Sequence, residues 1–211
     1  MVRLRDNNPT TITPFVTYTL IGADVFIYLY LLSLNQQQLQ QLFYNAAMVP
    51  CQLSSACPNL AAPGLPEWMT LFTSQFLHGS FLHIAANMLY LWIFGNNIED
   101  RLGHVKYLIF YLVCGALAAL AQWFFSKNSA IPYIGSSGAI AGIIGAYILR
   151  YPRAEILRLV LIFFFLLSTV RLSTAPSNIG MEDGGIIQWA HGGGFVFGAI
   201  LGSLLGLFRR D

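Results

Sequence analysis

Six long apolar segments dominate this chain, and each is close to the length that a helix needs to cross a lipid bilayer. The apolar core of a bilayer is about 30 Å thick, which about 20 helical residues span. Segments of this kind cover residues 14–34, 76–96, 105–125, 134–151, 156–175 and 187–208. Because 56% of the residues are hydrophobic and only 9% are charged, the composition excludes an ordinary soluble domain. We expect an all-α membrane protein with six transmembrane helices in a single domain over residues 1–211.

The placement of lysine and arginine predicts the orientation of these helices. Nine of the eleven basic residues fall on one side of the membrane, and only Lys127 and Arg171 fall on the other. Since cytoplasmic segments carry the excess of lysine and arginine, both termini are expected in the cytoplasm, with residues 1–13 as an N-terminal cytoplasmic segment. The first apolar segment lacks a small-residue cleavage site, so we expect it to be retained as a span.

The connection over residues 35–70 is the only long loop and is expected to lie outside the cell. Its amphipathic stretch at Leu39–Phe43 suits the membrane interface, and a solvated spacer is the alternative. Cys51 and Cys57 lie close together in this loop. They would form a disulfide in an oxidising compartment, whereas two free thiols are about as well supported.

The fourth apolar segment begins with a serine between small residues, in the run Gly135-Ser136-Ser137-Gly138. From Ser137 to Arg150 there are 13 helical steps, or roughly 20 Å. If Arg150 lies at one membrane surface, Ser137 lies about 10 Å below the other. A buried serine at the positive end of a helix is suited to stabilising an oxyanion. Close helix packing by small residues is the alternative, and the motif alone favours that alternative.

A histidine in the sixth segment is predicted to reach this serine. Glycines at positions 194, 198, 202 and 206 form a flat stripe, and small residues at 138, 142 and 146 form a second one. If the stripes meet, His191 lies beside Ser137 as a general base beside a nucleophile. A packed intramembrane histidine is the alternative. No acid lies near the middle of the second, fourth or sixth segment, and Asp24 in the first is expected to be a partner-satisfied polar or interfacial residue, so we predict a Ser-His dyad.

Two polar side chains in the second segment are candidates for holding an oxyanion. His83 and Asn87 are four residues apart, so they share one face of a helix. The amide of Asn87 offers N–H donors, although a hydrogen bond between helices is the alternative. His78 lies on another face and suggests a structural role. His78, His83 and His191 could in principle bind zinc, but the sequence contains no H-E-x-x-H motif. We therefore expect neither a metal nor a cofactor.

Taken together, these motifs resemble those of the rhomboid family of intramembrane serine proteases. The resemblance covers about residues 67–208. It rests on four short motifs: His78-x4-His83-x3-Asn87, Glu99-Asp-Arg-Leu-Gly, Gly135-Ser-Ser137-Gly138 and Ala190-His191-x2-Gly194-x3-Gly198. Two positions depart from the pattern of many members, because Trp68 is followed by Met69 instead of arginine and because Ala141 replaces a tyrosine that stacks on the histidine.

The resemblance implies a role for each of these residues. Ser137 would be the nucleophile and His191 the general base and then the acid. Asn87, His83 and the backbone N–H of Ser137 would hold the oxyanion. The other matching positions, His78, Gly135, Gly138, Gly194 and Gly198, would be structural residues near the site.

The expected activity is therefore cleavage of single-span membrane proteins near the outer membrane surface. The partners would be transmembrane substrates and the lipid bilayer, and the net charge of +2 without a basic run argues against nucleic acid. A bacterial inner membrane is the expected location, with the site open to the periplasm or the outside. The alternatives are a non-proteolytic rhomboid-like protein that binds transmembrane clients, and a small transporter.

Overall fold

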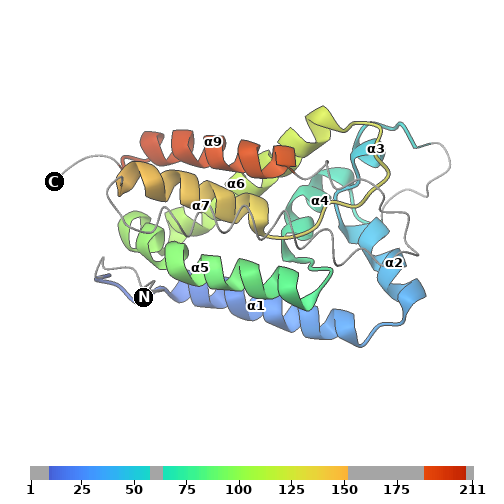
Figure 1. The fold of residues 1–211 in the computed structure, drawn as a ribbon, viewed down its shortest axis with the longest axis horizontal. Helices are drawn as coiled ribbons and strands as arrows, with labels where there is room; N and C mark the ends of the chain where they lie inside the picture. The colour runs from blue at the N-terminus through green and yellow to red at the C-terminus, as the bar shows by residue number, and fades with distance from the viewer. Residues whose placement is uncertain (1–9, 58–63, 152–187, 208–211) are drawn as a thin grey trace.

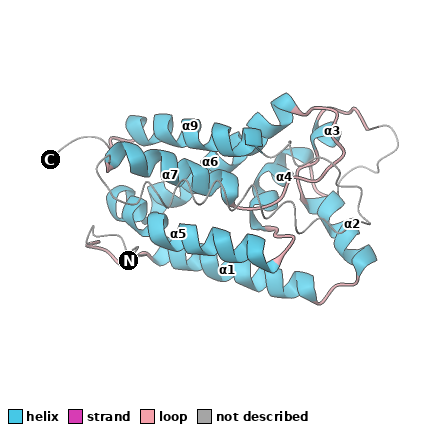
Figure 2. Cartoon of the chain, viewed as in Figure 1, coloured by secondary structure: helices cyan, strands magenta, loops and turns pink. Residues whose placement is uncertain are grey.

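The computed structural model describes residues 10–57, 64–151 and 188–207, and all its regular elements are helical (Figures 1 and 2). The predicted fifth span, residues 156–175, lies outside the described residues. The helices are α1 (Phe15–Leu32), α2 (Gln36–Ala46), α3 (Pro50–Leu53), α4 (Glu67–Thr73), the 3-10 turn η1 (Ser74–Phe76), α5 (Phe81–Leu102), α6 (His104–Phe125), α7 (Ser137–Arg150) and α9 (Gln188–Leu204). The all-helical class is thus confirmed for this part of the chain.

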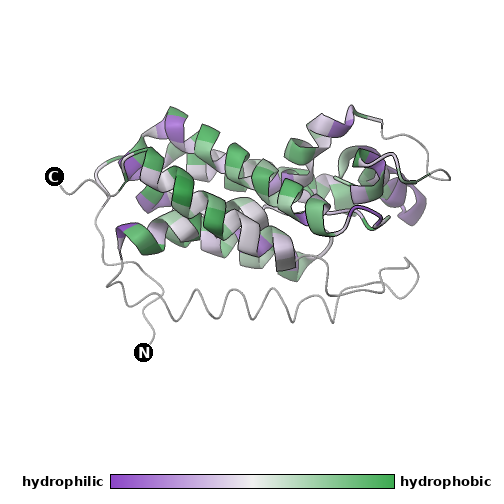
Figure 3. Cartoon of the chain, turned by 90° about the horizontal axis from the view of Figure 1, so that it is seen from above, coloured by the Kyte–Doolittle hydropathy of each residue, from purple (hydrophilic) through white to green (hydrophobic). Residues whose placement is uncertain are grey.

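Within the described ranges, two helices are long and apolar enough to cross a membrane, namely α1 and α6. The pair formed by residues 67–76 and α5 counts as a third if it is one bent span. Helix α7 is apolar but has only 14 residues. The predicted total of six spans therefore stays a prediction. Hydrophobic residues cover most of the helices in Figure 3, and the most hydrophilic colours lie near helix ends and in the short helices of the first loop.

The second predicted span begins later than its apolar composition indicates. We predicted a span from residue 76, whereas α5 starts at Phe81 and is bent by 85° from the preceding helical segment. The reason is local, because the side chain of Ser80 accepts a hydrogen bond from the backbone N–H of His83 and so caps α5. His78 consequently lies in the bend before the helix.

The first loop is a folded element rather than a spacer. It contains α2, α3 and α4. Asn35 and Gln38 form a reciprocal capping box at the start of α2, in which each side chain accepts a hydrogen bond from the other residue's backbone N–H. Phe43 of α2 packs in a small apolar cluster with Leu31, Leu77 and other residues. The loop is therefore attached to the body of the protein.

A buried carboxylate ties the first helix to the rest of the bundle. Glu99 near the end of α5 accepts hydrogen bonds from the backbone N–H groups of Val16 and Thr17, at 2.8 Å each, and from the hydroxyl of Thr17 at 2.6 Å. His104 contacts the same carboxylate at 2.6 Å. The first N–H groups of a helix have no partner within the helix. Glu99 supplies that partner for α1, whose N-cap residue Pro14 provides no side-chain hydrogen bond.

The two predicted stripes of small residues meet, which confirms that part of the sequence analysis. A Cβ atom built on Gly194 would strike the carbonyl oxygen of Gly138, and one built on Gly198 would strike that of Gly142. These contacts hold the backbones of α7 and α9 against each other, as Figure 1 shows. The stripe is shorter than predicted, because α9 ends at Leu204 and Gly206 lies beyond it.

Candidate active site

The hydroxyl of Ser137 lies 2.8 Å from Nε2 of His191, although the two residues are 54 positions apart in the chain. Ser137 is the first residue of α7, and His191 lies in the first turn of α9. Both are almost fully buried, with 2% and 7% of their surfaces exposed. The distance is short enough for direct proton transfer between a nucleophile and a base. The contact predicted from the two stripes is therefore confirmed.

The turn that presents Ser137 depends on Gly135. This residue has a φ of +112°, a conformation that residues with a Cβ rarely adopt. Its N–H donates to the carbonyl oxygen of Ser74 at 2.9 Å, which fixes the turn against η1. Ser136 then stands at the N-cap position of α7, but its side chain caps none of the helix N–H groups. The start of α7 is thus shaped by the backbone of Gly135 and not by a capping side chain.

The side chains of His83 and Asn87 lie against this same turn. A Cβ built on Gly135 would lie 2.7 Å from Nε2 of His83 and 3.7 Å from Nδ2 of Asn87. Asn87 is completely buried, and neither polar atom of its amide has a hydrogen-bond partner among the described residues. An unsatisfied buried amide costs about 1–3 kcal/mol. Its donor is thereby available to a group that forms beside Ser137.

His78 lies behind the serine and not beside it. Its Nε2 contacts the hydroxyl of Ser136 at 3.3 Å, and its ring meets that of His83 edge to face at a centroid distance of 5.1 Å. The residue is 1% exposed. These contacts are compatible with the structural role expected for His78, since it touches the neighbours of Ser137 and His83 without reaching the serine hydroxyl.

The sequence analysis assigned no role to any residue of the third span and so missed a polar residue in it. Gln122 of α6 is fully buried, and its side-chain oxygen accepts a hydrogen bond of 3.3 Å from the backbone N–H of Ala190. Its amide nitrogen donates to the hydroxyl of Ser126 at 3.0 Å. Gln122 therefore anchors the residue before His191. A glutamine within an apolar span was the signal, because such a side chain rarely lies in a membrane helix without a partner.

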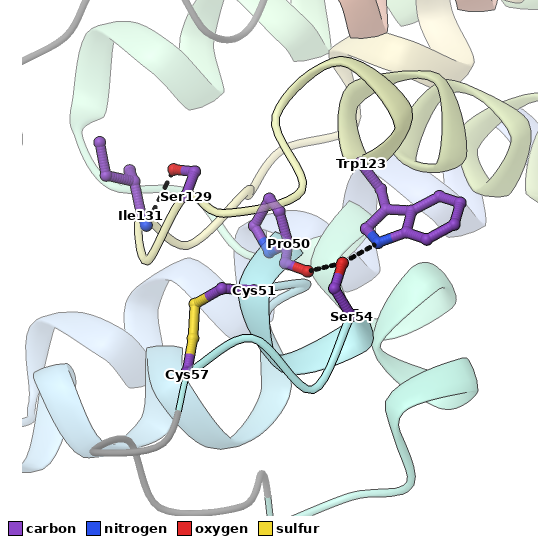
Figure 4. Close-up of a disulfide and its surroundings, with 7 residues drawn as sticks. All are labelled: Pro50, Cys51, Ser54, Cys57, Trp123, Ser129 and Ile131. Atoms are coloured by element: carbon purple, nitrogen blue, oxygen red, sulfur yellow. Dashed lines mark hydrogen bonds between the residues drawn. A yellow bond between two sulfur atoms is a disulfide. The ribbon is translucent and has the colours of Figure 1, made fainter.

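The first loop holds the segment that leads into Ser137. Met48 and Tyr133 form an antiparallel bridge, and the N–H of Cys51 donates to the carbonyl oxygen of Ser129 at 2.9 Å. Cys51 and Cys57 form a disulfide with Cα atoms 5.3 Å apart, as Figure 4 shows. This decides between the two alternatives that the sequence left open.

A side-chain contact adds to this attachment on the other side of α3. Trp123 at the end of α6 donates its indole N–H to the hydroxyl of Ser54 at 2.7 Å (Figure 4). Further along, a Cβ built on Gly138 would lie 2.6 Å from the hydroxyl of Tyr133. The loop, the entering segment and the first turn of α7 thus form one packed unit.

No metal centre is found in the part of the chain that the structure describes, where no three His, Cys, Asp or Glu side chains are placed to hold an ion. His78 and His83 lie close together, whereas His191 contacts the serine instead of joining them. The arrangement offers a hydroxyl nucleophile, an imidazole base and an amide donor. These are the components of acyl transfer to serine.

A model of the rhomboid domain family matches residues 65–208 of the chain. Similar proteins include Rhomboid protease GluP of Bacillus subtilis (strain 168), which is 35% identical over 150 residues that cover 68% of this chain and 28% of GluP. Rhomboid-like protein 11, chloroplastic, of Arabidopsis thaliana is 27% identical over 154 residues, 68% of this chain and 54% of the plant protein. Presenilin-associated rhomboid-like protein, mitochondrial, of Homo sapiens is 30% identical over 137 residues, 61% of this chain and 35% of the human protein.

The matches thus span about half or less of the relatives' own lengths. Within this chain, the matched region holds the helices that carry Ser137 and His191. Since the rhomboid model covers well over half of the residues, the chain belongs to the rhomboid family.

Proposed function

We propose that this protein is an intramembrane serine endopeptidase. The observation that carries the proposal is the 2.8 Å contact between the hydroxyl of Ser137 and Nε2 of His191. Asn87 adds to it, because its buried amide lies beside the same turn without a described partner. The name of GluP, a rhomboid protease, supports the same activity for the matched region.

In the proposed reaction, the oxygen of Ser137 attacks the scissile carbonyl carbon while His191 accepts the serine proton. The negative charge moves to the carbonyl oxygen, which the N–H of Ser137 and the side chains of Asn87 and His83 hold. The carbon–nitrogen bond then breaks, and His191 gives its proton to the leaving amine. Water, deprotonated by His191, hydrolyses the acyl-enzyme and releases Ser137. In this proposed dyad, a group other than a carboxylate orients the ring of His191.

The proposed substrates are single-span membrane proteins, cut near the outer membrane surface. Ser137 begins a helix that is too short to cross the bilayer, which supports a nucleophile below one membrane surface. A substrate helix must unwind locally, because its carbonyl groups are otherwise hydrogen-bonded within the helix. Glycine or proline near the cut reduces the cost of unwinding, by about 1 kcal/mol for glycine.

The proposed orientation places the first loop and the mouth of the site outside the cytoplasm. Two independent observations support it. In the predicted six-span topology nine of the eleven basic residues fall on the opposite side, and the Cys51–Cys57 disulfide suits an oxidising compartment. A bacterial inner membrane, with the site open to the periplasm or the outside, fits both observations. Since relatives with mitochondrial and chloroplast names exist, an organelle membrane is the competing location.

The decisive experiment incubates the purified protein in detergent with a tagged single-span substrate. We expect cleavage by the wild type, none by Ser137→Ala or His191→Ala, and no effect of a metal chelator. The alternative, a non-proteolytic protein that binds transmembrane clients, predicts no cleavage and a cellular role that survives Ser137→Ala. The intact contact between Ser137 and His191 favours the protease, because a binding protein does not need this pair.

A further inference from the structure

Asp24 and Gln75 are buried polar side chains that the proposed reaction does not use. Asp24 is 0% exposed, and neither oxygen of its carboxyl group has a hydrogen-bond partner among the described residues. The partner-satisfied or interfacial residue expected at this position is therefore not what this part of the chain shows. Gln75 in η1 is 1% exposed and differs from Asp24, because its amide nitrogen makes two hydrogen bonds. Only Gln75 is thus seen to hold parts of the fold together.

The side chain of Gln75 attaches η1 to α6. Its Nε2 atom donates to the carbonyl oxygen of Leu71 in α4 at 3.0 Å and to that of Leu112 in α6 at 3.2 Å. The amide lies on the backbone of α6 at Gly115. A Cβ atom on this glycine would strike the amide, and the three atoms nearest to it all belong to Gln75. Gly115 therefore provides the space in which the amide reaches Leu112.

Ser74, the residue before Gln75, extends this attachment to the turn before Ser137. The carbonyl oxygen of Ser74 accepts hydrogen bonds from the N–H of Leu77 at 3.3 Å and from the N–H of Gly135 at 2.9 Å. Gly135 has the positive φ on which that turn depends. The position of η1 consequently decides where the turn lies.

The same short helix also sets the start of α5. Only residues 77–80 separate η1 from α5, which carries His83 and Asn87. The side chains of both residues lie against the turn at Gly135. On one side η1 is thus connected to the proposed oxyanion donors of α5, and on the other side to the turn that presents the N–H of Ser137.

We propose that Gln75, seated on Gly115, is a positioning residue that aligns the two halves of the proposed oxyanion site. It acts through Ser74 and the start of α5, and not on the substrate. Donors stabilise a developing charge best when they are fixed before the reaction, so a shift of η1 would weaken them. This inference rests on the proposed function, in which these donors hold the oxyanion.

The test uses the purified full chain in detergent and four measurements. These are kcat and KM for a tagged single-span substrate, the rate at which a fluorophosphonate labels Ser137, the Tm, and hydrogen exchange of the peptide that contains Gly135. Gln75→Met keeps the length of the side chain but removes the donor. It should lower kcat and the labelling rate about tenfold and speed exchange of the Gly135 N–H. KM should stay the same, because the oxyanion forms only after binding.

A second pair of variants tests the contact with the glycine. Gly115→Ala should lower kcat and speed exchange as Gln75→Met does, because the new methyl group displaces the amide. Gln75→Ala should also lower kcat about tenfold. In the Gln75→Ala background no amide remains to be displaced, so adding Gly115→Ala should have no further effect on kcat.

Gly95→Ala is the matched control for loss of packing. Its methyl group would strike the hydroxyl of the buried Tyr107, so this change also collides with the polar end of a side chain. Gly95 follows Asn87 by eight residues, about 12 Å along α5. The variant should have a lower Tm, with the wild-type kcat and the wild-type exchange at Gly135 once folded.

The inference is overturned if folded Gln75→Met keeps either the wild-type kcat or the wild-type exchange at Gly135. It is also overturned if Gly115→Ala acts equally with and without Gln75, or if Gly95→Ala loses as much kcat as Gly115→Ala. If the folded wild type neither cleaves nor is labelled, the proposed function itself fails and takes the inference with it. If the wild type is labelled at Ser137 and only the variants behave unexpectedly, the proposed function stands and the positioning role of Gln75 falls.

Discussion

The backbone of Gly198 on α9 packs directly against that of Gly142 on α7, and this contact sets the distance between the two helices that carry the candidate catalytic pair. One turn closer to the site, Gly194 meets Gly138 in the same way. Helix backbones approach this closely only where no side chain separates them. The relation between Ser137 and His191 is thus determined partly by residues that take no part in the proposed chemistry.

Replacing Gly198 with alanine should therefore reduce both stability and activity. The new methyl group would strike the carbonyl group of Gly142 and push the helices apart. We expect the free energy of unfolding to fall by about 1–3 kcal/mol. Cleavage should fall by on the order of tenfold to a hundredfold, because small misplacements of reacting groups are costly. Thermal unfolding in detergent and kcat/KM measure the two effects.

Gly22→Ala is the matched control for that variant. It makes the same change within a helix, but a Cβ at Gly22 meets nothing within 4 Å. Its stability should be unchanged or higher by up to about 1 kcal/mol, as expected for alanine over glycine in a helix. Equal losses in the two variants would show that the contact between α7 and α9 is not what matters.

Asn87→Ala should lower kcat about a hundredfold to a thousandfold with little effect on KM, since the amide is proposed to act on the oxyanion alone. The comparison is Asn97→Ala on the same helix, another buried asparagine, whose amide donates to the side chain of Asn96 at 2.9 Å and lies far from Ser137 along α5. That variant should lose stability without losing kcat once folded. Steady-state kinetics on both, with circular dichroism to verify folding, distinguish an oxyanion donor from a packing residue.

Glu99→Ala should destabilise the protein by about 3 kcal/mol, because it leaves the buried N–H groups of Val16 and Thr17 without their acceptor. Glu67, exposed in the first turn of α4, serves as the control, and its alanine variant should change stability by less than about 0.5 kcal/mol. Thermal unfolding of both variants in the same detergent gives the comparison. A Glu99→Ala protein as stable as the wild type would contradict the capping role.

Reduction of the Cys51–Cys57 disulfide should lower the stability of the first loop by about 2 kcal/mol. Dithiothreitol should therefore shift thermal unfolding of the wild type to lower temperature. The double variant Cys51→Ser, Cys57→Ser should unfold at that lower temperature with or without the reductant. The double variant still contains Cys114. If the reductant also lowers the unfolding temperature of the double variant, the effect does not come from the Cys51–Cys57 disulfide.

Local composition predicted most helices of the described bundle to within a few residues. The segments around α1, α6 and α7 could be found because long apolar runs end at proline, glycine or charged residues, whatever packs around them. The start of α5 could not, because Leu77 to Ser80 are compatible with a longer span, and only the Ser80 cap and the 85° bend exclude it. In the first loop only the amphipathic stretch Leu39–Phe43, which lies within α2, was noted, and α3 and α4 were missed because they are too short to show a clear period.

The candidate site was predictable where it depends on residue type and spacing. Ser137 and His191 were identified because hydroxyl and imidazole groups are costly in apolar helices, and the glycine stripes indicated that the two helices approach closely. Gln122 was passed over. Its importance lies in its contact with the backbone of Ala190, and no local pattern records such a partner.

The sequence by itself indicated that this chain belongs in a membrane, where the long apolar helices of the described bundle lie and which two helices pack at glycine, since these properties follow from the side chains of single segments. The tertiary structure alone decided that the serine hydroxyl and the imidazole lie 2.8 Å apart, that Cys51 joins Cys57, and that Asp24 has no hydrogen-bond partner among the described residues. Each of these relations joins atoms whose separation depends on how several helices pack at once, and a packing contact is a property of all the surfaces that form it.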